Sequence, residues 1–138
     1  MKANLVIMAM VAGLLLSAVP AWAHHSFAAE YDGTKPITLQ GTVTKMDWVN
    51  PHIWIHLEVK NPDGSVTGWM VEGGSPNALL RRGFTRNSLP LGTELVVKAF
   101  LAKDGTHLAN GQQLTLADGK KLFLGSSAGE PGAAPAEK

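Results

Sequence analysis

Aliphatic side chains recur at every second position between His52 and Lys60, where they alternate with polar side chains and one tryptophan, Trp54. The aliphatic residues are Ile53, Ile55, Leu57 and Val59. Successive side chains of a β-strand point to opposite faces, so this alternation predicts a strand with one buried face. A strand of this kind must belong to a sheet that covers an apolar core, and this constrains the fold more than any other feature of the chain.

Further segments with β-strand patterns predict that most of the chain is a sheet. Apolar periodicity bounded by turn residues predicts strands over residues 38–48, 66–72, 94–102, 112–117 and 120–124. Within the first of these segments the apolar phase shifts from Val43 to Met46. Such a shift predicts a β-bulge near Thr44 or Lys45.

One short helix is expected between the third and fourth strands. Ser75 can cap it, Pro76 suits the first helical position, and Gly83 ends it. The order of elements predicts an all-β fold with one short helix: a small five- to six-stranded antiparallel barrel like the oligonucleotide/oligosaccharide-binding (OB) fold. A generic small antiparallel barrel or sandwich is the alternative.

The first 23 residues have the pattern of an export signal. Lys2 supplies a positive start, residues 5–19 are almost entirely apolar, and Ala21-Trp22-Ala23 is a small-residue cleavage site. The apolar run is shorter than the roughly 20 residues that a bilayer span needs. We expect cleavage after Ala23, a periplasmic or secreted product and no stable membrane anchor, with an uncleaved anchor as the alternative.

Composition divides the mature chain into three parts. Residues 24–36 form a polar N-terminal lead-in, and residues 37–124 are expected to form the OB-like barrel domain. Residues 125–138 contain no large apolar side chain, so we expect a disordered tail.

Charge and cysteine content exclude several classes of function. Lys2 is one of 12 Lys and Arg residues, so 11 remain after cleavage against 11 Asp and Glu. Binding to nucleic acid depends on an excess of cations that neutralise phosphates, so we expect no nucleic acid partner. The chain has no cysteine, which excludes disulfides, blue-copper sites and cysteine-ligated iron–sulfur clusters.

The five histidines all follow the expected cleavage site, and His24 and His25 would begin the mature chain. An N-terminal histidine offers its α-amine and its imidazole to one metal ion, and Cu(II) prefers nitrogen ligands. His52 and His56 are candidates for a further ligand. Their Cα atoms would lie about 13 Å apart in an ideal strand, so we expect one of them to join, and His52 beside Asn50–Pro51 is favoured.

This candidate copper site resembles the histidine brace of copper oxygenases and of some periplasmic copper carriers in His24 alone. The alternative is that all four histidines are ordinary polar surface. Adventitious copper or nickel binding to an exposed His-His terminus is expected in either case.

Aromatic residues offer a second kind of candidate site. Trp54 shares the polar face of its strand with His52 and His56, so its ring is placed to stack on a ligand. Trp48 and Asn50 are further candidate ligand-binding residues at the adjoining turn. The alternative for Trp48 is that it covers the core.

Four segments resemble a family of small exported bacterial proteins catalogued only as a domain of unknown function. They are His24–Phe27, Trp48–His52, Gly74–Gly83 and Leu114–Gly119. The resemblance covers nearly all of residues 23–125. It implies an exported barrel-like domain and implies no activity.

A binding role therefore fits the sequence better than catalysis. Ser75 and Ser88 have no motif that places a base beside them, and the glycines before Ser75 lack the lysine of a phosphate loop. We expect a non-catalytic periplasmic module that binds an unknown small ligand or a transition metal such as Cu(II). A protein-interaction domain with a periplasmic protein partner is the alternative, and a copper-dependent redox enzyme is the third possibility.

Overall fold

The computed structural model describes residues 27–125. The expected export signal, the candidate metal ligands His24 and His25, and the expected tail beyond Gly125 lie outside the described residues. Gly125 itself continues the fold, since its backbone N–H donates to the carbonyl of Gln112 at 3.3 Å.

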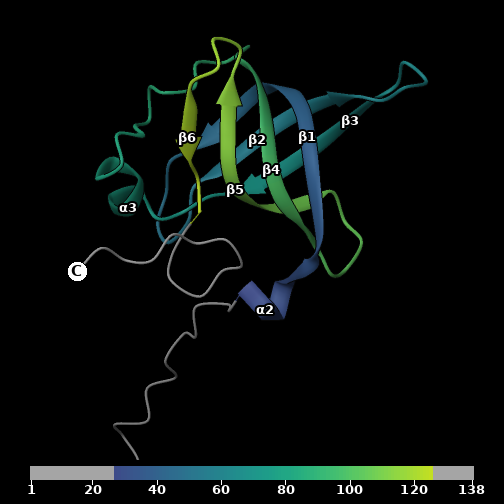
Figure 1. Cartoon of the computed structure of the whole chain (residues 1–138), viewed down its shortest axis with the longest axis horizontal. Helices are drawn as coiled ribbons and strands as arrows, with labels where there is room; N and C mark the ends of the chain where they lie inside the picture. The colour runs from purple at the N-terminus through teal and green to yellow at the C-terminus, as the bar shows by residue number, and fades with distance from the viewer. Residues whose placement is uncertain (1–26, 126–138) are drawn as a thin grey trace, which may run out of the picture.

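The described part is mostly β, with six strands and two short helices (Figure 1). In chain order the elements are α2 (Phe27–Glu30), β1 (Tyr31–Asp47), β2 (Trp54–Lys60), β3 (Val66–Glu72), α3 (Pro76–Leu80), β4 (Glu94–Ala102), β5 (Leu108–Leu116) and β6 (Lys121–Phe123).

The expectation of a single helix was wrong, because α2 lies within the expected lead-in. The ring of Phe27 packs 5.7 Å from that of Tyr31 and 5.6 Å from that of Phe100, measured between centroids. These aromatic contacts attach α2 to the sheet, and they had no local signal in the sequence.

The strands form one antiparallel sheet with the order β3-β2-β1-β4-β5-β6. β3 also pairs with β5, and this additional pairing is parallel. Its register joins Met70 to Leu108, Val71 to Ala109 and Glu72 to Asn110. The strands therefore make a partial ring around the core, which Figure 1 shows in outline.

β1 is the long strand that both parts of the sheet share. It pairs with β4 from Tyr31 to Thr42 and with β2 from Thr42 to Asp47. The β1–β2 register shifts between Val43 and Lys45, which confirms the bulge predicted at this point. The strand begins at Tyr31 rather than at residue 38, because the earlier residues pair with the end of β4.

The alternation of β2 has the predicted effect on packing. Ile53, Ile55 and Leu57 are fully buried, and the core continues through side chains of the other elements, including Val43, Val71, Leu79, Phe84, Val97 and Leu114. The α3 prediction is also confirmed: the Ser75 hydroxyl accepts from the Ala78 N–H at 3.3 Å, with Pro76 in the first turn.

Gly111 is a position where the core has no room for a side chain. A Cβ atom there would lie 2.4 Å from Cδ2 of Leu124 and 2.8 Å from Cγ1 of Val71. Both neighbours are fully buried, so neither can move aside freely. We expect Gly111→Ala to lower the free energy of unfolding by about 1–3 kcal/mol through overpacking, measured by urea denaturation.

Gly68→Ala is the matched control in β3, because a Cβ atom there meets nothing within 4 Å. This variant should unfold at the wild-type urea concentration or above it. Equal stability of the two variants would contradict the packing described for Gly111.

Candidate functional site

A buried polar cluster lies where the start of β1, the end of β3 and the residues before β2 meet. It consists of Tyr31, His52 and Glu72. The Glu72 residue is only 6% exposed. Its carboxylate accepts a hydrogen bond from the Tyr31 hydroxyl through Oε2, and its Oε1 lies 3.2 Å from Nδ1 of His52. A buried carboxylate is costly unless it is paired, so these two partners offset its desolvation.

Strand register explains why Glu72 is buried although its neighbour Val71 is the one that points into the core. Glu72 lies opposite Trp54 of β2 on one side and opposite Asn110 of β5 on the other. Asn110 is 3% exposed, and its Oδ1 accepts from Nε2 of Gln112 at 2.6 Å. The parallel β3–β5 pairing thus places a second polar group beside the cluster.

The hydrogen bonds of His52 determine which of its ring nitrogens can bind a ligand. Nδ1 lies 3.0 Å from the carbonyl oxygen of Gly73 and 3.2 Å from Oε1 of Glu72. A carbonyl oxygen only accepts, so Nδ1 carries the proton and Nε2 of the neutral ring carries the lone pair. Metal-ligating histidines are oriented in this way, by donation to a carboxylate or a backbone carbonyl. His52 therefore stays a candidate ligand, with Nε2 as the ring nitrogen that carries the lone pair.

His56 belongs to a different set of contacts. Its Nε2 lies 2.9 Å from Oδ2 of Asp47, and Oδ1 of Asp47 lies 2.8 Å from Nζ of Lys45. Hydrogen bonds from Lys45 and then from His56 lower the pKa of the Asp47 carboxyl below its ordinary value. His52 contacts Glu72 whereas His56 contacts Asp47, so the two histidines belong to separate clusters.

The candidate ligand-binding residues also separate. The Trp48 ring stacks on Phe84, with centroids 5.9 Å apart and planes 8° apart, and packs against the core. This placement agrees with the alternative expectation for Trp48. Asn50 is exposed and precedes a cis peptide bond to Pro51. Trp54 is half-buried and lies opposite both Asp47 and Glu72, so it borders the polar cluster.

Phe27, the first described residue, lies beside the polar cluster. Its ring packs against that of Tyr31, while the backbone N–H of Lys103 donates to the carbonyl of Glu30 at 2.9 Å. The start of the described chain is thus next to the tyrosine that binds Glu72. The candidate ligands His24 and His25 precede Phe27 in the sequence and lie outside the described residues.

Sequence reasoning missed Tyr31 and Glu72. Tyr31 lies in the expected lead-in, and Glu72 is the last residue of a predicted strand, where a polar side chain is ordinary. Their hydrogen bond spans 41 positions of the chain, so no local pattern could reveal it. Within residues 27–125, no group of three or more His, Asp or Glu side chains is arranged to hold a metal ion.

Comparison with known proteins identifies a family whose function is unknown. Residues 11–112 match a family described as "Family of unknown function (DUF6152)". No curated protein and no solved structure matches the chain. Neither helix in the described residues has the length and apolar character needed to cross a membrane.

The hydroxyl of Tyr31 can be tested without disturbing its ring. Tyr31→Phe removes the donor to a buried carboxylate, so we expect the free energy of unfolding to fall by about 1–3 kcal/mol in urea denaturation. His56→Gln, which removes the surface pair with Asp47, is the control and should have little effect. A Tyr31→Phe variant as stable as the wild type would show that this hydrogen bond does not hold Glu72.

Proposed function

Because the chain belongs to the DUF6152 family, whose function is unknown, we propose a role from its own residues. It is a non-catalytic exported binding module that holds a transition metal, with Cu(II) as the best match, between its mature N-terminus and His52. The observation that carries this proposal is the hydrogen bonding of His52, whose Nδ1 is held by Gly73 and Glu72.

The ligands would come from two places, the mature N-terminus and His52. His24 supplies its α-amine and its imidazole, His52 supplies Nε2, and His25 is a further candidate. Phe27, Tyr31 and Glu72 connect the two, because each contacts the next and Glu72 contacts His52. Nitrogen ligands in this number suit Cu(II). His56 is a weaker candidate because its ring is directed to Asp47.

Export is part of the proposal, since the chelate exists only after cleavage. Lys2, the apolar residues 5–19 and the small-residue pattern at Ala21 and Ala23 support removal of residues 1–23. The mature protein would then act in the periplasm or outside the cell.

We also infer an OB-like barrel as the finer description of the fold. Support comes from the element order, in which three strands precede α3 and three strands, β4, β5 and β6, follow it. The parallel β3–β5 pairing further supports it, because it links the third strand to the fifth. In this arrangement β6 is an addition at the outer side of β5.

A second candidate function is protein interaction through the outer face around Trp54. Trp54 is half-buried beside Asp47 and Glu72, and the neighbouring Met70 is 39% exposed opposite His56. An aromatic ring and a thioether beside polar groups are typical of interaction surfaces. The face would bind a periplasmic protein.

The metal proposal is tested by Cu(II) titration of the exported protein, with glycine as a competing chelator. His52→Gln should weaken Cu(II) binding by at least about tenfold. That is the lower limit of the loss in metal affinity when even a group that only supports a metal ligand is removed. His56→Gln is the matched control and should bind as the wild type does. One glycine added before His24 should also weaken binding, because it moves the α-amine away from the imidazole.

Two results would overturn this proposal. Equal affinities of the His52 and His56 variants would mean that the terminus binds copper without the fold. Unchanged affinity after the glycine extension would mean that the α-amine is not a ligand. Near-UV circular dichroism of each variant establishes that it is folded.

The interaction alternative predicts a different result. Trp54→Ala should abolish recovery of a co-purifying periplasmic protein while the Cu(II) content stays unchanged. Leu91→Ala, at a side chain that is 70% exposed elsewhere, should recover the partner normally. A partner retained by Trp54→Ala would exclude this surface.

A further inference from the structure

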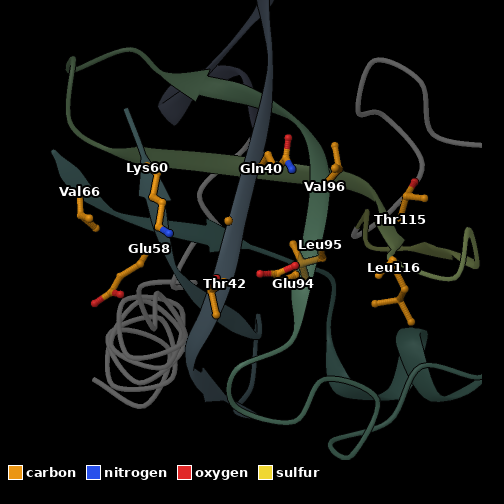
Figure 2. Close-up of a pocket in the computed structure, with 12 residues that line it drawn as sticks. Gln40, Thr42, Glu58, Lys60, Val66, Glu94, Leu95, Val96, Thr115 and Leu116 are labelled. Carbon is orange, nitrogen blue, oxygen red and sulfur yellow. The ribbon is translucent and has the colours of Figure 1, made fainter. Parts of the chain in front are cut away.

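A groove of about 480 Å³ crosses the outer face of the sheet (Figure 2). Its walls come from β1, β2, β4, β5 and the first residue of β3, and it shares no residue with the polar cluster. We propose that this groove binds an alkylammonium group, the charged end of a primary aliphatic amine. This inference does not depend on the copper proposal.

Three hydrogen-bond acceptors form one row at the groove. Thr42 of β1 is paired with Glu58 of β2 on one side and with Glu94 of β4 on the other. Paired residues point to the same face, and neighbouring strands lie about 4.8 Å apart, so the Cα atoms of the two glutamates are about 10 Å apart. Figure 2 shows the two glutamates on either side of β1.

Neither carboxylate forms an ion pair with another side chain in the described part of the chain. Both residues are exposed, and the ion pairs within residues 27–125 involve other carboxylates. Two negative charges facing each other across one strand repel, so a cation placed between them is favoured.

The number of acceptors and the lining favour an ammonium ion over a metal ion. A primary ammonium group has three N–H donors, which match Glu58, Thr42 and Glu94. Calcium would need six to eight oxygen ligands, more than this row supplies. Val96 is half-buried in the same groove and offers an apolar surface for the aliphatic stem.

Lys60 sets the strength of binding. It lies two residues from Glu58 on the same face of β2 and lines the groove with its own ammonium group. The Lys60 ammonium group forms no ion pair with Glu58 or Glu94, since its nitrogen lies more than 4 Å from the oxygens of both carboxylates. Its positive charge disfavours a second cation. Removing that charge should therefore tighten binding.

The proposal is tested by titrating the exported protein with n-pentylammonium in phosphate buffer, followed by ¹⁵N NMR shifts at Thr42 and Glu94. Pentanol lacks the charge and pentyltrimethylammonium lacks the N–H donors, so both should bind at least about tenfold more weakly. Glu94→Gln should lose about tenfold in affinity for n-pentylammonium.

Charge variants make the test specific to the groove. Lys60→Met should bind n-pentylammonium more tightly than the wild type, whereas Lys120→Met, which removes a charge at the β5–β6 turn, should bind as the wild type does. The proposal is overturned if the wild type does not bind n-pentylammonium. It is also overturned if Glu94→Gln and Lys60→Met both leave the affinity unchanged.

The same chemistry has two natural sources, a free amine and a lysine side chain of a polypeptide. Nα-acetyl-lysine-N-methylamide distinguishes them in a parallel titration. Binding equal to that of n-pentylammonium supports a lysine side chain as the ligand. Loss of binding with this blocked lysine, while n-pentylammonium still binds, supports a small free amine.

Discussion

The parallel pairing of β3 with β5 holds the polar cluster in place. Three residue pairs make this contact, and the last of them sets Glu72 opposite Asn110. The same contact keeps Val71 and Ala109 in the core and brings Gly111 against Leu124. Parallel strands cannot be joined by a tight turn, and the chain that connects β3 to β5 contains all of α3 and β4. A buried carboxylate at its end depends on every one of those elements.

The parts of the fold that could be predicted are those with local signals. The period of two in β2 identifies Ile53, Ile55 and Leu57 as core, because burial of alternate side chains is a property of one strand. The shift of apolar phase near Thr44 and the cap at Ser75 are also local, and both are confirmed. The β3–β5 pairing and the start of β1 at Tyr31 depend on distant segments.

The candidate site divides in the same way. His52 was favoured over His56 from its place beside a turn, which is a local property. Its partner Glu72 could not be found, because the carboxylate is buried by strands and by a tyrosine that lie far away in the sequence. Trp48 is the converse case, because its place near a turn made it a candidate ligand-binding residue. In the structure its ring stacks on Phe84, so it has a packing role.

The hydrogen bonds of each imidazole say more about metal binding than the number of histidines does. His52 and His56 both contact a carboxylate, but the two carboxylates differ. Asp47 forms an ion pair with Lys45, and the hydrogen bond from Lys45 lowers the pKa of the Asp47 carboxyl. The carboxylate is therefore a weaker acceptor for a histidine N–H.

Glu72 contacts the Tyr31 hydroxyl and the His52 ring, and its neighbours in the strand register are Trp54 and Asn110. It is buried, where a hydrogen bond to His52 is electrostatically stronger than one at the surface. A carboxylate of this kind accepts the hydrogen bond from Nδ1 of His52 and fixes the orientation of the ring. Under the copper proposal His52 is therefore the stronger candidate of the two, for a reason that lies in the partner of its ring and not in the spacing of histidines along the strand.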